Sequence, residues 1–226
     1  MSNKKAIVLL SGGLDSATCL ALATNKNLSC YALSFDYGQR SKVELNSATK
    51  IANNHNVVVH KIVNLQDLGS FGGSTITDHS LSMQISDHKP QIASSYVPAR
   101  NTVFLAIALS WAEAIDADYI YIGVHNDDRS CYPDCRPEYI EKFQYMANVA
   151  NKKGVEGKPI KIEAPLLNKS KAEIITLGTK LGLDYSKTVT CYQADEEGRA
   201  CGKCLSCCTR KSGFAMAGIP DPTIYQ

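Results

Sequence analysis

Short runs of apolar, often β-branched residues alternate along the chain with longer segments in which apolar residues recur every three or four positions. The short runs predict strands, and the longer segments predict helices with a buried face. Strands are expected at residues 6–10, 29–35, 57–63, 119–124 and 160–163, and helices at residues 15–24, 39–53, 101–114, 137–150 and 171–181. This alternation predicts an α/β fold whose five-stranded, mostly parallel sheet is flanked by helices.

Two of the predicted helices carry boundary signals. Ser170 and Glu173 have the spacing of a capping box at the start of the last helix, and Gly182 stands just past its final apolar position. Asn101 is expected to cap the helix at residues 101–114. Because that helix is apolar on nearly every side, we predict that it is buried.

The composition is that of an ordinary globular protein, and only the number of cysteines is unusual. The 226 residues include 24 Lys and Arg against 22 Asp and Glu, so the net charge of +2 lacks the basic excess of a nucleic-acid-binding protein. No run approaches the roughly 18 apolar residues of a membrane span, and no secretory signal is recognisable. We therefore expect a cytoplasmic protein without nucleic-acid or membrane partners. In that reducing compartment, nine cysteines favour metal ligands or catalysts over disulfides.

The first predicted strand runs into residues 11–16, S-G-G-L-D-S, which open the first helix. Two glycines let the backbone approach an anion closely, two serines offer hydroxyl donors, and the helix start supplies free N–H groups. Asp15 would repel a bare phosphate, but it fits if Mg²⁺ lies between them. The loop predicts a phosphate site, and the alternative is a tight turn in which Asp15 or Ser16 caps the helix. The sequence of this loop matches neither the lysine-containing P-loop nor the G-x-G-x-x-G dinucleotide fingerprint.

Four cysteines near the end of the chain have the spacing C-x9-C-x2-C-x2-C: Cys191, Cys201, Cys204 and Cys207. Two-residue gaps let thiolates converge, and four thiolates at about 2.3 Å around Zn²⁺ form a closed structural site. Cys208 is left out because adjacent side chains rarely point at one metal. A redox C-x-x-C pair and an iron–sulfur cluster are the alternatives. We expect a zinc-binding segment, residues 186–226, packed on the domain formed by residues 1–185.

Three polar stretches follow predicted strands or precede predicted helices, at residues 34–40, 96–101 and 123–137. In open α/β sheets, ligands bind at this carboxyl edge of the strands. Two arginines there, Arg100 and Arg136, are suited to bidentate binding of a carboxylate or phosphates. Asp134 is expected to accept hydrogen bonds from the ring N–H groups of a heterocycle, and Tyr132 to stack on it. The alternative for each stretch is a solvated loop.

In its strand–loop–helix setting, S-G-G-L-D-S resembles the signature of the PP-loop, or N-type, ATP pyrophosphatases. Together with S-F-D-Y-G-Q-R, Y-V-P-A-R-N, Y-P-D-C-R-P-E and C-G-K-C in this order, it resembles the family of 7-cyano-7-deazaguanine synthases, the preQ0 synthases of queuosine biosynthesis. The resemblance runs from Ala6 to about Phe214. The chain departs from the family pattern at Cys131, where the pattern has glycine, and Cys131 is left without a role.

The resemblance implies a Rossmann-like PP-loop fold, one zinc ion per chain and a homodimer. It also implies a ligase that uses ATP and Mg²⁺ to join ammonia to 7-carboxy-7-deazaguanine and then dehydrates the amide to a nitrile. The residues that contact ATP would be Leu10, Ser11, Gly12, Gly13, Leu14, Asp15, Ser16 and Arg100. The catalytic residues would be Ser11, Asp15, Ser16 and Lys171, the last of which resembles a lysine that other PP-loop enzymes place near pyrophosphate. The residues assigned to the substrate are Tyr132, Asp134 and Arg136.

Other functions remain open from the sequence. A tRNA-sulfurating PP-loop enzyme would use Cys131 and Cys135 as sulfur carriers, but it needs a basic tRNA surface that the net charge of +2 does not suggest. A non-catalytic zinc-ribbon binding module would leave the polar sheet edge unexplained. Residues 67–98, rich in Gly, Ser, Thr, Asp and His, predict either a lid or binding loop or a disordered insertion.

Overall fold

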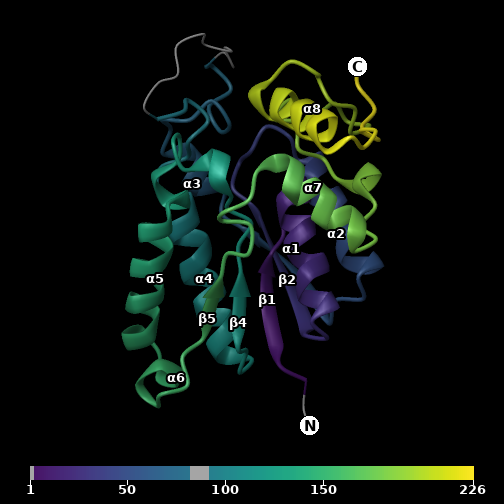
Figure 1. Cartoon of the computed structure of the whole chain (residues 1–226). Coiled ribbons are helices and arrows are strands. Elements are labelled where there is room, and N and C mark those ends of the chain that lie inside the picture. The colour runs from purple at the N-terminus through teal and green to yellow at the C-terminus, as the bar shows by residue number, and fades with distance from the viewer. Residues whose placement is uncertain (1–2, 82–91) are drawn as a thin grey trace.

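The computed structural model describes residues 3–81 and 92–226, and its centre is a five-stranded sheet (Figure 1). The strands are β1 (Lys5–Leu9), β2 (Ser29–Asp36), β3 (Val59–Asn64), β4 (Tyr119–Tyr121) and β5 (Lys161–Glu163). They lie in the order β3-β2-β1-β4-β5, and all neighbours pair in parallel. The predicted five-stranded α/β sheet is confirmed, and the whole of it, not only most of it, is parallel.

The central strand β1 illustrates why the sheet is buried on both faces. Ala6 and Val8 pack into the core on one face, whereas Ile7 and Leu9 pack into the core on the other, because side chains alternate along a strand. A continuous apolar run, as in residues 6–10, is typical of a parallel strand that is covered on both sides. The absence of alternation in this run agrees with the burial of both faces of β1.

Helices cover both faces of the sheet (Figure 1). On one side lie α1 (Leu14–Asn25), α2 (Val43–Asn54) and α7 (Lys171–Lys180), and on the other lie α4 (Arg100–Ala114) and α5 (Pro137–Ala150). Two shorter helices are α3 (Gln66–Ser70) and α6 (Lys152–Val155). Among the described residues, no helix has the combination of length and apolar character needed to cross a bilayer.

The sequence analysis missed one long helix, α8 (Leu205–Ala217), which follows the cysteines. Phe214 of α8 belongs to the same core cluster as Leu14 of α1 and Ile175 of α7, so the tail packs on the helices that cover the sheet. Gly218 ends α8 in the left-handed conformation, with φ +67°. A glycine at this position is a usual helix stop and was the available sequence signal.

Several predicted boundaries are wrong. Helix α2 begins at Val43 instead of residue 39, because Gln39 folds back: its Oε1 accepts from the Tyr37 N–H and its Nε2 donates to the Phe35 carbonyl. Strand β4 ends at Tyr121 instead of residue 124, since the chain then turns toward α1. The predicted start of β3 is also two residues early.

Asn101 does not cap α4, which begins one residue earlier, at Arg100. Its backbone N–H donates instead to Asp134 Oδ2, at 3.0 Å, so an aspartate far along the sequence satisfies this helix end. The helix is also less buried than predicted. Leu105 and Leu109 lie in the core, whereas Ser110 on the opposite side is exposed, because α4 covers the sheet with only one face.

The capping signals of α7 are confirmed. Ser170 Oγ accepts from the Glu173 N–H at 3.4 Å, and Glu173 Oε2 accepts from the Ser170 N–H at 2.8 Å. Gly182 lies just beyond the helix with φ +76°. A capping interaction of this type contributes about 1 kcal/mol, and here it fixes the start of the helix that carries Lys171.

The predicted lid or insertion at residues 67–98 is described only in part, since residues 82–91 lie outside the described residues. The preceding segment is tied to the end of β2 by one arginine. Arg40 Nε donates to the Thr75 carbonyl, and Nη2 donates to the carbonyls of Asp78 and Leu81, each at 2.6 Å. This attachment places the segment beside the carboxyl edge of the sheet.

Candidate active site

A cavity of about 550 Å³ lies at the carboxyl ends of β1, β2 and β4. The order of the strands reverses between β1 and β4, and in open α/β sheets such a reversal creates the crevice where ligands bind. The loop after β1 contributes Ser11 to the lining, the segment after β2 contributes Tyr37, and the segment after β4 contributes His125. Helix α8 also borders the cavity, through Leu205 and Arg210.

The loop after β1 has the geometry of an anion cradle. Ser11 Oγ accepts from the Gly13 N–H at 3.2 Å and lies 3.0 Å from Ser16 Oγ. Gly12 has φ +89°, and a Cβ there would lie 2.1 Å from the Glu44 carbonyl oxygen, so only glycine fits. Gly13 is the N-cap of α1 and makes no side-chain capping bond. The alternative in which Asp15 or Ser16 caps α1 is therefore wrong, and the helix start is free to face an anion.

Asp15 and Lys171, both predicted to be catalytic, are brought together beside this loop. Lys171 Nζ, at the start of α7, donates to Asp15 Oδ1 at 2.7 Å and to Oδ2 at 2.9 Å. The same Nζ lies 2.8 Å from His125 Nε2, which lies 3.3 Å from Asp128 Oδ2. Three elements that are distant in sequence thus build one cluster of mixed charge.

The two carboxyl groups of this cluster differ in their titration. Burial raises the pKa of Asp15, but Lys171 and His125 together outweigh it and hold that pKa below its ordinary value. Burial raises the pKa of Asp128, His125 opposes it, and the negative charge of Asp15 adds to the rise. Asp15 is therefore ionised at neutral pH, and its charge orients the Lys171 ammonium beside the loop.

Arg100, predicted to contact ATP, faces the same cavity from the start of α4. Its Nη1 donates to Tyr37 Oη at 3.1 Å, and its guanidinium lies over the rings of Tyr37 and Phe104, at 5.5 and 5.8 Å from their centres. A guanidinium has five N–H donors, so this arginine keeps others for an anionic ligand.

The residues predicted to bind the substrate separate into two groups. Tyr132 lines the cavity, and its hydroxyl lies 2.7 Å from Ser95 Oγ. In the described chain, Asp134 and Arg136 are not part of that lining. Asp134 is buried with Oδ2 against the Asn101 N–H, and Arg136 is exposed, with Nε donating to the Arg129 carbonyl at 3.2 Å. The structure therefore gives these two residues contacts other than the cavity.

The polar residues at the cavity that were not predicted as site residues include Glu44, His125 and Asp128. His125 and Asp128 lie in the polar stretch at residues 123–137, so their position after a strand was the available signal. Glu44 lies in the first turn of α2 and carries no comparable signal. Burial raises the pKa of Glu44 to about 7, although Arg100 and the hydrogen bond from Gln39 oppose the rise.

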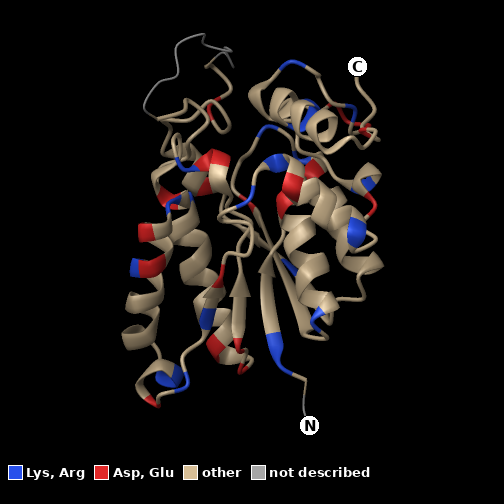
Figure 2. Cartoon of the chain, viewed as in Figure 1, with Lys and Arg blue, Asp and Glu red and all other residues tan. Residues whose placement is uncertain are grey.

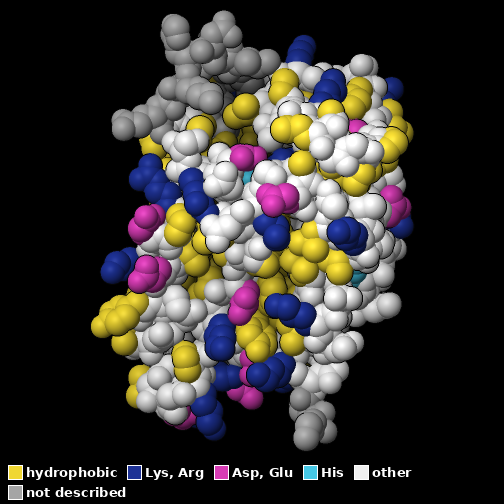
Figure 3. Space-filling view, in the orientation of Figure 1, with side chains coloured by type: hydrophobic (Ala, Val, Ile, Leu, Met, Phe, Trp, Pro, Cys, Tyr) yellow, Lys and Arg dark blue, Asp and Glu magenta, His cyan; other side chains and the backbone are white. Residues whose placement is uncertain are grey.

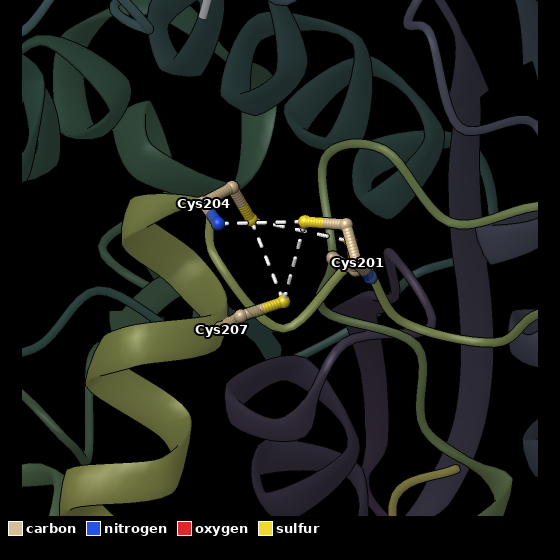
Figure 4. A group of neighbouring side chains, drawn as sticks. Cys201, Cys204 and Cys207 are labelled. Carbon is tan, nitrogen blue, oxygen red and sulfur yellow. Dashed lines mark hydrogen bonds between the residues drawn. The ribbon is translucent and has the colours of Figure 1, made fainter. Parts of the chain in front are cut away.

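The four predicted zinc ligands converge at the start of α8. Their sulfur atoms all lie within 4.8 Å of one another, and Figure 4 shows those of Cys201, Cys204 and Cys207 pointing toward a common centre. The Cys191–Cys204 and Cys201–Cys207 separations are 4.0 Å, and Cys204–Cys207 is 3.5 Å. Bonds of about 2.3 Å to one tetrahedral Zn²⁺ imply sulfur separations of about 3.8 Å, so the geometry fits zinc.

The electrostatics of the cluster also indicate a cation. Contacts among the three sulfurs raise the pKa of Cys207 and Cys191 and lower the pKa of Cys204, because a thiolate at one position disfavours a second thiolate beside it. Four thiolates at this spacing therefore repel one another unless a metal ion compensates their charge.

The other cysteines are dispersed. Cys19 and Cys30 are buried within the core, and Cys208 is exposed. Cys131 lines the cavity, where its Sγ lies 3.4 Å from Ser130 Oγ. Cys135 is buried, and Asn101 Nδ2 donates to its sulfur. Burial raises the pKa of the Cys135 thiol, which disfavours the thiolate that sulfur transfer requires.

Charges of both signs are mixed over the chain. Acidic and basic positions alternate along the ribbon in Figure 2, and the face in Figure 3 carries no extended basic patch. This agrees with the net charge of +2. A surface that binds tRNA through its phosphates would instead gather basic side chains.

Comparisons with known proteins agree over nearly the whole chain. A family model described as queuosine biosynthesis protein QueC matches residues 5–218. The chain is 59% identical over 222 residues to a 7-cyano-7-deazaguanine synthase of Coxiella burnetii (98% of each chain), and 57% identical over 223 residues to one of Legionella pneumophila (99% of this chain and 97% of that one).

A solved structure, the NMN synthetase of Francisella tularensis, shares the fold. The TM-score is 0.53 with 14% sequence identity, and the match covers 96% of this chain and 79% of that one. The Rossmann-like PP-loop fold expected from S-G-G-L-D-S is thereby supported by structure as well as by sequence.

Proposed function

The chain belongs to the queuosine biosynthesis protein QueC family, and from this premise we propose that it converts 7-carboxy-7-deazaguanine and ammonia to 7-cyano-7-deazaguanine at the expense of ATP. One observation carries the proposal beyond the family relationship. The anion cradle at residues 11–16, the Lys171 ammonium and the Arg100 guanidinium all face a single cavity. These groups are suited to binding a nucleotide phosphate and a substrate carboxylate side by side.

The first half of the reaction makes an amide. A carboxylate resists attack by ammonia because it is anionic and would have to expel oxide. In the proposed step, a substrate carboxylate oxygen attacks the α-phosphorus of ATP, the bond to the bridging oxygen breaks, and pyrophosphate leaves with that electron pair. Ammonia then adds to the acyl-adenylate carbon, loses a proton, and expels AMP.

The second half removes water from the amide without a new kind of chemistry. The amide oxygen attacks the α-phosphorus of a second ATP and again releases pyrophosphate. Loss of AMP and of the remaining N–H protons then leaves the carbon–nitrogen triple bond. Each half needs an oxygen on the same substrate carbon beside the α-phosphorus of a bound ATP, so one cavity serves both.

The chain's own groups stabilise the charge that develops on the phosphates. Backbone N–H groups of the loop and the hydroxyls of Ser11 and Ser16 donate to phosphate oxygens, and Lys171, oriented by Asp15, supplies a positive charge. Arg100 binds an anionic oxygen of ATP or of the substrate carboxylate, and Tyr132 packs against the substrate ring. Asp134 acts indirectly, by holding the start of α4, which carries Arg100.

Magnesium fits this site through its oxygen ligands. Asp15 and Asp128 belong to the same cluster. Burial raises the pKa of Asp128 and the negative charge of Asp15 adds to the rise, so a cation between the two carboxyl groups would relieve their repulsion. When bound, Mg²⁺ would neutralise phosphate charge and favour departure of pyrophosphate. Both oxygens of Asp15 already contact Lys171, so the metal and the ammonium would share this carboxylate.

Zinc, held by Cys191, Cys201, Cys204 and Cys207, would be structural, since four protein ligands leave no open position. We expect Cys204→Ser to lose the metal and to lower the free energy of unfolding by about 4 kcal/mol. Metal content by mass spectrometry and thermal unfolding test this. The matched control is Cys208→Ser, four residues along α8, which should keep both values. Full zinc content in Cys204→Ser would contradict the assignment.

The proposal also extends to the domain organisation, the oligomeric state, the location and the partners of the protein. The two segments, residues 1–185 and 186–226, would act as one catalytic unit in a cytoplasmic homodimer that acts on small molecules and binds no nucleic acid. Thr75 and Ser95, which lie on either side of residues 82–91 in the sequence, line the cavity. Light scattering tests the dimer, and a tight, salt-sensitive shift with tRNA would favour the sulfurtransferase alternative.

The function is tested with purified protein, ATP, Mg²⁺, ammonium and 7-carboxy-7-deazaguanine, followed by mass spectrometry. We expect the nitrile to form only when all components are present, with the amide as an intermediate. A matched reaction with Asp15→Ala should form little product. Failure of the wild-type protein to form either amide or nitrile would reject the proposed function.

A further inference from the structure

Glu44 is a half-buried acid that lines the cavity, and the proposed mechanism gives it no role. It lies in the first turn of α2, whose backbone packs against Gly12 of the phosphate loop. This packing puts the Glu44 carboxyl and the anion cradle in the same cavity. An acid at this position is costly unless it meets a donor, because burial removes the water that would solvate its charge.

The carboxyl is held firmly but only by one of its oxygens. Gln39 Nε2 donates to Glu44 Oε1 at 3.1 Å, and Gln39 is itself fixed by the Tyr37 N–H and the Phe35 carbonyl. Within residues 3–81 and 92–226, no hydrogen bond reaches Oε2 and no ion pair reaches either oxygen. The titratable or charged groups that face Glu44 are Arg100 on α4 and Tyr37 after β2.

The surroundings suit a flat, uncharged heterocycle. Phe35 and Phe104 stack with ring centres 3.9 Å apart and both line the cavity, as does Tyr37. A planar ring against this wall would present an edge to Glu44. A carboxylate accepts best from two adjacent N–H groups, one for each oxygen or both on one oxygen.

We propose that Glu44 is a specificity-determining residue that accepts hydrogen bonds from the adjacent ring N–H and exocyclic amino group of the 7-deazaguanine substrate. This inference rests on the proposed function. The 2-aminopyrimidinone edge of that ring offers two neighbouring donors, which match a carboxylate with a vacant oxygen. Arg100, across the cavity, is then placed for the acceptor oxygens of the same substrate.

Adenine, the other heterocycle in the reaction, requires a hydrogen-bond donor as well as an acceptor from the protein. Its edge pairs one amino donor with a ring-nitrogen acceptor, so an ionised Glu44 would meet a lone pair. Only the protonated acid would suit adenine. The pKa of Glu44, about 7, makes the two cases separable by pH. Deazaguanine binding should strengthen as Glu44 ionises with rising pH, whereas adenine binding through Glu44 would weaken.

The experiment is calorimetric binding of 7-carboxy-7-deazaguanine to the wild-type protein and to Glu44→Gln, with saturating α,β-methylene-ATP, from about pH 5.5 to pH 8.5. Glutamine keeps the shape and the hydrogen bond from Gln39, so the fold is retained. We expect wild-type affinity to rise through a pKa near 7. The glutamine variant should bind about 10- to 150-fold more weakly at the upper pH, with a flatter profile.

A second probe is the analogue without the exocyclic amino group. The wild-type protein should bind it about 10-fold or more weakly than the full substrate, and Glu44→Gln should discriminate far less. Equal affinity of both proteins for the full substrate would overturn the proposal. So would a change confined to the nucleotide, because Glu44 would then serve adenine. Nitrile formation by the wild-type protein in that case would leave the proposed function intact while rejecting this inference.

Discussion

Asp15 and Glu44 are two carboxyl groups that line one cavity, and their surroundings are opposite in kind. Lys171 contacts both oxygens of Asp15, and this contact holds the pKa of Asp15 below its ordinary value. Glu44 has only an amide donor on one oxygen, and burial raises its pKa to about 7. Burial acts on both, so the cation makes the difference.

The contrast separates two roles for buried charge. A carboxylate that is already paired, as Asp15 is with Lys171, orients that neighbouring group before any ligand binds. A carboxylate that forms no ion pair within the described residues and accepts on only one oxygen, as Glu44 does, is suited to a ligand that brings its own donors. The cysteine cluster is a third case, because its four like-charged ligands require a cation from outside.

Removal of the cation from Asp15 should have the largest effect. Lys171→Ala deletes the positive charge beside the phosphate loop and leaves Asp15 without the ammonium group that contacts both of its oxygens. We expect kcat for nitrile formation to fall about 10²- to 10³-fold and the pKa of Asp15 to rise. Lys180→Ala, at the exposed end of the same helix, is the matched control and should keep normal turnover. Normal turnover in Lys171→Ala would contradict its role.

A milder way to disturb the Asp15 pair is to push on Lys171 from α8. A Cβ at Gly213 would lie 2.4 Å from Lys171 Cγ, so Gly213→Ala must displace that side chain. We expect kcat to fall about 10-fold with little change in the KM for ATP, because Lys171 is misplaced. Alanine favours helix more than glycine does, so a loss of helix stability would not explain this fall. Ser212→Ala, exposed on the same helix, should be neutral. An unchanged kcat in Gly213→Ala would show that the position of Lys171 is not critical.

The unpaired state of Glu44 predicts an unusual pH dependence of stability. Because its folded-state pKa, about 7, lies above that of the unfolded chain, the folded state binds the proton more tightly. The contribution of Glu44 is therefore most favourable at low pH and is lost as pH rises through about 7. Without ligands, Glu44→Gln should raise the free energy of unfolding at pH 8 by on the order of 1 kcal/mol.

Asp15 should show the opposite dependence, since its folded-state pKa is lowered. Its stabilising contribution is present above the unfolded-state pKa and is lost as pH falls through the folded-state pKa. Chemical denaturation over a pH series measures both trends. Destabilisation of Glu44→Gln at pH 8 would indicate that Glu44 already has a strong partner in the free protein.

The smallest effect is expected at a third acid, Asp134, which is buried against the start of α4 and does not line the cavity. Asp134→Ala should lower the free energy of unfolding by about 1 kcal/mol, because the Asn101 N–H loses its acceptor. The KM for 7-carboxy-7-deazaguanine should change little. Exposed Arg136→Ala is the neighbouring control. A large rise in KM with unchanged stability would return Asp134 to the substrate site.

What the sequence could predict depended on how local each feature is. The sheet followed from apolar runs such as residues 6–10, and the zinc ligands from spacing within residues 191–207, where chain connectivity alone brings the groups together. The phosphate loop was likewise a contiguous string in a recognisable setting. The capping box of α7 was local too, and the structure confirms it.

Features made by contacts between distant segments could not be predicted in this way. The roles of Asn101 and Asp134 at the start of α4 depend on a contact across 33 positions, and the Asp15–Lys171 pair spans 156. Glu44 has no local signal, since its burial arises only when α2 packs on Gly12. Helix α8 was missed because the cysteines, and not the apolar period, dominated the interpretation of the tail.

The central claim is that the cavity activates one substrate oxygen by transferring it to the α-phosphorus of ATP. Mass spectrometry after turnover with substrate labelled by ¹⁸O in its carboxylate tests this most directly. We predict that the AMP formed carries the label, in the amide-forming and in the nitrile-forming half alike. Unlabelled AMP, or label in inorganic phosphate together with ADP, would contradict the account.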